Sequence, residues 1–142
     1  MSHSEIREAL VTYGPISNKN TYELINYTKS GINYTTFAAV VKNSPFDIKE
    51  WAAFLHTSER TIQRYQKDKK AFGPVHSEKI IQIVMLLSKG IEVFGNKSSF
   101  YTWLETKNIA LGGIKPKDLL DSSFGIDLLN NELIRIEHGI LA

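Results

Sequence analysis

Apolar residues recur along most of the chain at the three- and four-residue spacing of amphipathic helices, while the alternation typical of strands is hard to find. Good N-caps precede several of these stretches. Asn33 and Asp47 are examples, and Glu50 stands at the capping-box position relative to Asp47. The pattern predicts an all-α fold with about eight helices, at residues 21–30, 34–42, 47–55, 58–69, 78–94, 98–106, 116–121 and 127–138.

The segments between these helices carry turn residues. The stretch up to Asn20 is weakly patterned and contains Tyr13-Gly14-Pro15, so we expect a tail there. Ser77 is the expected cap of the long apolar helix, and Gly125 is expected to separate the last two helices. Residues 108–113 contain two glycines and predict a loop with at least one positive φ.

Residues 48–66, IKEWAAFLHTSERTIQRYQ, have the pattern of a helix-turn-helix. That motif needs a small residue in its first helix, here Ala52, so that the second helix can cross it closely. The turn position that usually holds glycine is His56, so the pattern requires a histidine that accepts a positive φ. The apolar anchors are expected to be Leu55, Ile62 and Tyr65.

The second helix of this motif has side chains that suit the edges of DNA bases. Arg pairs with guanine, Gln with adenine, Glu with cytosine and Ser with either, while lysines at the helix end can reach phosphates. The predicted DNA contacts are Ser58, Glu59, Arg60, Thr61, Gln63, Arg64, Lys67 and Lys69, with Lys70 beside them. The alternative is an ordinary helical hairpin with a solvated charged face.

The C-terminal helix has a second strong pattern. Its apolar stripe, spaced for one face, is formed by Ile126, Leu129, Leu133 and Ile136. Leu128 and Ile134 add apolar surface outside that stripe. Either the helix is simply part of the core, or its second apolar face serves a partner.

Composition excludes several classes of site. The 142 residues include no cysteine, which excludes disulfides, thiolate zinc sites and a cysteine nucleophile. The four histidines, His3, His56, His76 and His138, lack metal-ligand spacing, and there is no Gly-rich phosphate loop or nucleophile elbow. We expect no enzyme activity, no metal and no cofactor. No stretch is apolar enough to span a membrane and the N-terminus is unlike a signal peptide, so a cytoplasmic location is expected.

The net charge of +2 is unevenly distributed. Residues 1–115 carry 15 Lys and Arg against 10 Asp and Glu, whereas residues 116–142 carry 2 against 5. A basic body followed by an acidic segment indicates two different partners, one of them a polyanion. A window of 27 residues can also differ this much by chance.

Motifs in the last third of the chain resemble a known domain. They are WLETKNIALGG at residues 103–113, KPKDLLD at 115–121, Gly125, and LIRIEHGILA at 133–142. This run is similar to the toxin-binding domain of the Xre/MbcA/ParS antitoxins, and SERTIQR and the long apolar helix upstream fit the same family. The resemblance covers roughly residues 20–142.

This resemblance implies an all-helical, dimeric type II antitoxin that represses its own operon through the helix-turn-helix. It implies binding to a RES-domain toxin, which destroys NAD by glycohydrolase or phosphorylase chemistry. Carried over by position, the toxin contacts are Arg135, Glu137, His138, Gly139, Ile140, Leu141 and Ala142. The expected domains are a variable tail at 1–20, an Xre-like helix-turn-helix domain at 21–95 and a helical toxin-binding domain at 96–142. The alternative is a stand-alone helix-turn-helix regulator whose C-terminal domain only dimerises.

Overall fold

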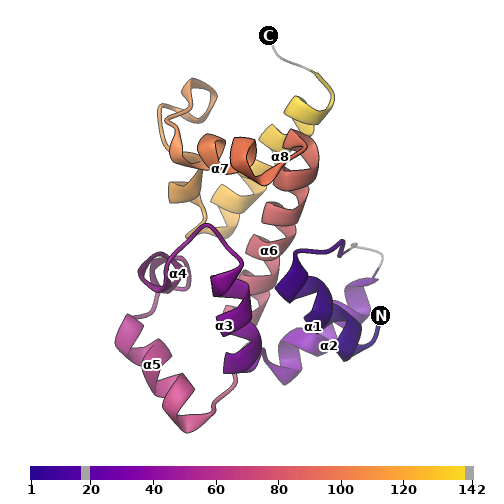
Figure 1. Cartoon of the computed structure of the whole chain (residues 1–142), viewed down its shortest axis with the longest axis vertical. Helices are drawn as coiled ribbons and strands as arrows, with labels where there is room; N and C mark the ends of the chain where they lie inside the picture. The colour runs from indigo at the N-terminus through magenta and orange to yellow at the C-terminus, as the bar shows by residue number, and fades with distance from the viewer. Residues whose placement is uncertain (17–19, 140–142) are drawn as a thin grey trace. The chain divides into compact units, whose positions relative to one another are not determined.

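The computed structural model describes residues 1–16 and 20–139, and its regular elements there are all helical (Figure 1). The all-α prediction is confirmed. The chain divides into two compact units, Met1–Met85 and Leu86–Ala142, and helix α6 begins in the first and ends in the second. The helices are α1 (His3–Thr12), α2 (Thr21–Ser30), α3 (Tyr34–Lys42), α4 (Ile48–Phe54), α5 (Glu59–Asp68), α6 (Pro74–Phe94), α7 (Lys97–Glu105), the 3-10 helices η2 (Ile109–Leu111) and η3 (Pro116–Leu119), and α8 (Ser123–Glu137).

Helices α2 to α5 lie close to where the sequence pattern places them, and side-chain caps fix the starts of α3, α4 and α5. The Asn33 side chain accepts a hydrogen bond from the Thr36 N–H at the start of α3. Asp47 and Glu50 form a reciprocal capping box at the start of α4. These bonds satisfy N–H groups that a helix leaves without an internal partner.

The expected N-terminal tail contains a helix, α1, so that expectation was wrong for residues 3–12. A capping box between Ser2 and Glu5 starts the helix, and Ile6 and Leu10 are fully buried. Helix α1 packs on α3 and α2. The Ser-x-x-Glu spacing was the signal available in the sequence, and only tertiary packing stabilises so short a helix.

The core of the first unit is aromatic. Phe37 of α3 and Trp51 of α4 are fully buried, with ring centroids 5.8 Å apart at 85°. Phe72, in the segment between α5 and α6, lies 4.8 Å from the Phe37 ring and 5.0 Å from that of Tyr65. These contacts hold α3, α4 and α5 against one another.

Helix α6 begins at Pro74, four residues before the predicted start, and Ser77 is not its N-cap. Proline is favoured at a first helical position, where its missing N–H is not needed. Ser77 is fully buried, and its hydroxyl accepts from the Ile32 N–H at 3.0 Å and donates to the Phe72 carbonyl at 3.2 Å. Phe72 in turn donates its N–H to the Ile32 carbonyl at 2.8 Å. We call these three residues the Ile32–Phe72–Ser77 junction.

The second unit packs α7 against the end of α6 through a close approach. Gly90, buried inside α6, faces the Phe100 ring so closely that a Cβ there would overlap it. Phe100 also packs on Phe94 and Trp103, with ring centroids 5.6 and 5.9 Å away. Glycine is unfavourable in a helix interior, so its presence is explained by the ring that occupies the place of its side chain.

Gly125 does not separate two helices, as the sequence pattern suggested, but lies in the first turn of α8. Its N–H donates to the Ser122 hydroxyl at 2.9 Å, and a Cβ there would clash with the Leu119 carbonyl oxygen of η3. Helix α8 therefore starts four residues earlier than predicted. Its predicted apolar stripe is confirmed, with Ile126, Leu129 and Leu133 buried and Ile136 half-buried.

Replacing Ser77 by Ala removes both side-chain hydrogen bonds of the junction and leaves the buried Ile32 N–H without its acceptor. We expect the free energy of unfolding to fall by about 1–3 kcal/mol. Ser98→Ala, at an exposed position of α7, should change it by less than about 0.5 kcal/mol. Urea unfolding of both variants measures the difference, and equal stability of the two would contradict the role assigned to the Ser77 hydroxyl.

Candidate functional site

Helices α4 and α5 form the predicted helix-turn-helix. Ala52 and Leu55 of its first part and Ile62 of α5 are buried, as the pattern requires. The chain reverses through the turn, where the Thr57 N–H donates to the Ala52 carbonyl at 3.0 Å. His56 adopts φ 54°, so the left-handed conformation expected at this position is confirmed. Histidine tolerates this region better than β-branched or bulky residues do.

The side chains at the start of α5 have a local structural role. The Ser58 hydroxyl accepts from the Thr61 N–H at 3.0 Å and donates to the Thr61 hydroxyl at 2.9 Å. Ser58 is thus the N-cap, and Thr61 is half-buried. These two residues define where α5 begins.

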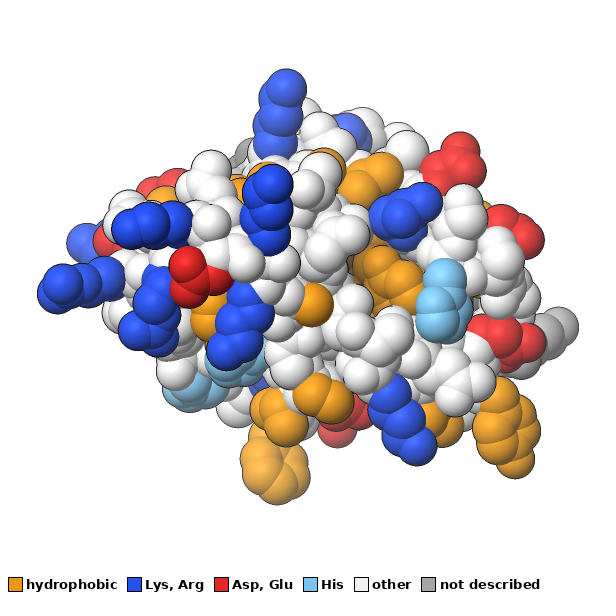
Figure 2. Space-filling model, turned by 90° about the horizontal axis from the view of Figure 1, so that it is seen from below, with side chains coloured by type: hydrophobic (Ala, Val, Ile, Leu, Met, Phe, Trp, Pro, Cys, Tyr) orange, Lys and Arg blue, Asp and Glu red, His pale blue; other side chains and the backbone are white. Residues whose placement is uncertain are grey.

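The rest of the predicted DNA-contacting set is exposed on α5 and at its end. These residues are Glu59, Arg60, Gln63, Arg64, Lys67 and Lys69. Arg60, Gln63, Arg64 and Lys67 share one side of the helix at spacings of three and four residues. Tyr65, an expected anchor, is half-buried, and the Lys70 ammonium lies 5.1 Å from the centre of its ring. Figure 2 shows Lys and Arg side chains gathered together, with few acidic side chains among them.

At the other end of the chain, Arg135, Glu137, His138 and Gly139 are exposed. Residues 140–142, the remaining members of the set carried over by position, lie outside the described residues. Gly139 has φ 67° and follows the C-cap of α8. The structure thus places the described part of this set at one helix terminus, at the surface of the second unit.

Glu137 is held by an ion pair. Its two carboxylate oxygens accept from the Lys89 ammonium of α6 at 2.8 and 3.0 Å. Hydrogen bonding to Lys89 lowers the pKa of Glu137 below its ordinary value, and the same bond raises the pKa of Lys89. The pair fixes the end of α8 to α6 within this unit. Arg135, two residues earlier in α8, pairs with Glu132 at 3.1 Å.

Sequence reasoning did not select one exposed apolar side chain of α8, that of Phe124. Phe124 is 89% exposed and Leu128 is 46% exposed. With Asn131, Arg135 and His138 they recur every three or four residues, which places all five on one face of α8. We call this the outer α8 face. The available signal was an aromatic residue at helical spacing from Arg135.

Two features, a metal-ligand cluster and a membrane-spanning helix, are absent from the residues that the structure describes. No group of three or more His, Cys, Asp or Glu side chains there is arranged to hold a metal ion. No helix among the described residues is long and apolar enough to cross a membrane. The exposed faces of α5 and α8 are the candidate functional surfaces.

Two family models match the chain. The antitoxin Xre-like helix-turn-helix domain matches residues 23–85, and the antitoxin Xre/MbcA/ParS C-terminal toxin-binding domain matches residues 89–139. Two curated proteins named antitoxin Xre, one from Yersinia enterocolitica and one from Photorhabdus laumondii, are each 29% identical over 84 residues. That alignment spans 58% of this chain and 57% of the length of each relative.

The Lys89–Glu137 pair gives the end of α8 a defined pH dependence. Because the pKa of Glu137 is lowered in the folded state, its contribution is complete above the ordinary glutamate pKa and is lost as pH falls through the lowered value. Because the pKa of Lys89 is raised, its contribution is complete below the ordinary lysine pKa and is lost as pH rises through the raised value. We expect the pair to be fully formed at neutral pH.

A carbon-13 titration of the Glu137 carboxyl tests this expectation. The pKa should lie below that of an ordinary glutamate and move back towards it in Lys89→Gln. Lys97→Gln, an exposed lysine at the start of α7, should leave it unchanged. A wild-type Glu137 that titrates like an ordinary glutamate would contradict the pairing.

Proposed function

This chain belongs to the Xre family of antitoxins, and we propose that it is a type II antitoxin that neutralises a RES-domain toxin and represses its own operon. The observation that carries the proposal is the succession of two domains on one chain, a helix-turn-helix at residues 23–85 and a toxin-binding domain at 89–139. We further propose that it acts without enzyme activity or cofactor, as a homodimer in the cytoplasm.

DNA binding is assigned to α5. Its exposed Arg60, Gln63 and Arg64 offer the donors that recognise purine edges in a major groove, and Lys67 can neutralise a flanking phosphate. In a homodimer the two α5 helices would read half-sites about 34 Å apart, or a multiple of that distance. Such a dimer bound to its own promoter would act as a repressor.

Toxin binding is assigned to the outer α8 face together with residues 137–142. Phenylalanine and arginine are both enriched at protein–protein interfaces, and an exposed example of each lies on this face of α8. Phe124 and Leu128 supply the apolar area, while Arg135 and His138 supply polar contacts on the same face. Ile140 and Leu141 would fill an apolar pocket of the toxin. The nearby Glu137 carboxylate would compete for the cationic side chains with which the toxin binds the phosphates of NAD.

The domain division of the sequence analysis stays a proposal. It assigns DNA binding to residues 21–95 and toxin binding to residues 96–142.

Arg64→Ala should weaken binding to the chain's own upstream region by about 1–3 kcal/mol, because it removes a bidentate base contact. Binding to an unrelated duplex should change much less. Lys67→Ala should instead weaken binding to both duplexes to a similar extent. Fluorescence anisotropy with the two duplexes measures both effects. An unchanged sequence preference in the Arg60→Ala/Arg64→Ala double variant would disprove the assignment of α5.

Phe124→Ala/Leu128→Ala should weaken neutralisation of the neighbouring RES-domain protein by tenfold or more, because exposed apolar anchors are lost. Removing residues 140–142 should also weaken neutralisation far more than it lowers the melting temperature. The measurement is NAD turnover by the toxin at increasing antitoxin concentration, with thermal melts of each variant.

Ile109→Ala is the matched control for these variants, since Ile109 is 95% exposed in the same unit but lies on η2. It should neutralise like wild type. Full neutralisation by both the double variant and the shortened chain would show that another surface binds the toxin.

A further inference from the structure

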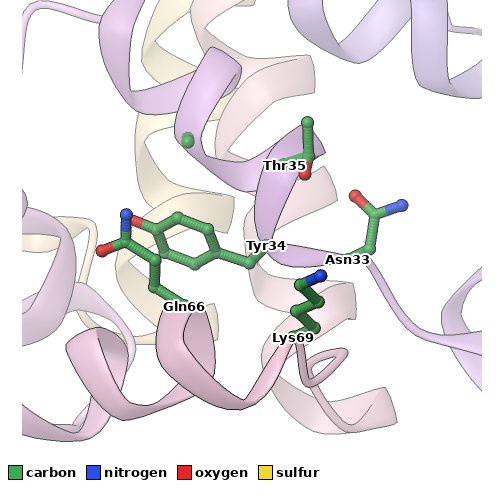
Figure 3. A pocket seen from close by; sticks show the side chains of 6 residues that line it. Asn33, Tyr34, Thr35, Gln66 and Lys69 are labelled. Atoms are coloured by element: carbon green, nitrogen blue, oxygen red, sulfur yellow. The ribbon is translucent and has the colours of Figure 1, made fainter.

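A hollow of about 580 Å³ lies between the first turn of α3 and the last turn of α5. In Figure 3 the Tyr34 ring extends towards Gln66, and the Lys69 side chain rises from the end of α5 towards α3. The residues that line it are Asn33, Tyr34, Thr35, Ala38, Gln66 and Lys69. Of these, only Lys69 belongs to the set predicted to contact DNA.

The lining of the hollow is cationic and rich in donors. Lys69 supplies a positive charge, and no lining residue is acidic. Hydroxyl and amide groups come from Tyr34, Thr35 and Gln66. The Asn33 side-chain oxygen is engaged with the Thr36 N–H, which leaves its amide nitrogen for donation. One positive charge with several neutral donors suits an anion of single charge.

The backbone at Lys69 is held in an unusual conformation. Lys69 is the C-cap of α5 with φ 52° and ψ 41°, the left-handed region in which glycine or asparagine is preferred. Its N–H donates to the Gln66 carbonyl, and the next N–H, of Lys70, donates to the Tyr65 carbonyl at 2.9 Å. A lysine here accepts conformational strain that a glycine would avoid, and its charge is placed beside the start of α3.

We propose that this hollow binds one phosphate of the DNA backbone, at the edge of the groove that α5 enters. The inference rests on the proposed DNA binding and extends the contact surface from the helix-turn-helix to α3. A phosphodiester carries one negative charge, which Lys69 neutralises, and the Thr35 hydroxyl, on the Lys69 side of the hollow in Figure 3, donates to a free oxygen. Gln66 is three residues from Gln63, so the hollow lies at the edge of the exposed face of α5. A phosphate contact at this position fixes the depth and angle of α5 without reading sequence.

Lys69→Gly tests the proposal, because glycine accepts the left-handed conformation while removing the charge. We expect affinity for the upstream duplex and for an unrelated duplex of equal length to fall by about eightfold at 0.1 M salt. The slope of log affinity against log salt should decrease by about 0.9, the value for one phosphate contact. Thr35→Val should weaken binding to both duplexes by roughly two- to fivefold, and Lys69→Arg should retain the wild-type slope.

Lys29→Ala is the matched control, since it removes one exposed lysine of the same unit, on α2. It should bind both duplexes like wild type. Phosphate ethylation interference locates the contact: one phosphate position that blocks wild-type binding should lose its effect in Lys69→Gly.

The possible failures are distinguishable. If wild type binds neither duplex, the proposed DNA binding is wrong and this inference falls with it. If wild type binds but Lys69→Gly and Thr35→Val match it in affinity and salt slope, only the phosphate contact is wrong. Equal losses in Lys69→Gly and Lys29→Ala would also overturn it, because the effect would then be one of net charge.

Discussion

The arrangement of the first unit depends on the Ile32–Phe72–Ser77 junction. Three hydrogen bonds close a segment of the chain that contains α3, α4 and α5, joining the residue before α3 to the residues that lead into α6. Gly31 is pressed so closely on the Phe72 carbonyl that a side chain at position 31 would collide with it. Because the junction is buried, its polar groups have no access to water and must pair with one another.

Closure at this point has a geometric consequence for the candidate DNA surface. It returns the end of α5 to the beginning of α3, so Lys69 and Asn33 border one hollow although they are far apart in sequence. It also places the Phe72 ring against Phe37 and Tyr65, so one side of α5 is packed on the core while its charged side stays exposed. Non-glycine residues with positive φ lie on both sides of α5, His56 in the turn before it and Lys69 at its C-cap.

The sequence was most informative where structure is local. Caps at Asn33 and Asp47 placed two helix starts, and the apolar stripe of α8 predicted which side chains are buried. The motif marked position 56 as one where glycine is usual, and His56 does adopt a positive φ there.

Contacts between distant segments were not predictable in the same way. Helix α1 depends on packing against α3, Ser77 resembles a cap but bonds to Ile32, and Gly125 resembles a break but lies inside a helix against Leu119. In each case the neighbouring sequence suggests one local structure, and a contact with a residue far away in the sequence produces a different one. The hollow beside Lys69 could not be predicted either, because no sequence pattern links residues 33–35 to residue 69. The family motif selected Arg135 and His138 as candidate toxin contacts, whereas it did not select Phe124 on the same face of α8.

The ion pair at the end of α8 also has a consequence for a partner that would contact the proposed toxin-binding surface. Glu137 already has a cation, Lys89, on both carboxylate oxygens. A carboxylate keeps lone pairs beyond the two that Lys89 uses, so an arginine or lysine of a partner can bind Glu137 without displacing Lys89. The charge of Glu137 is already compensated by Lys89, so such a contact adds little attraction from charge alone. A planar guanidinium that matches both oxygens would gain more from its geometry than from its charge.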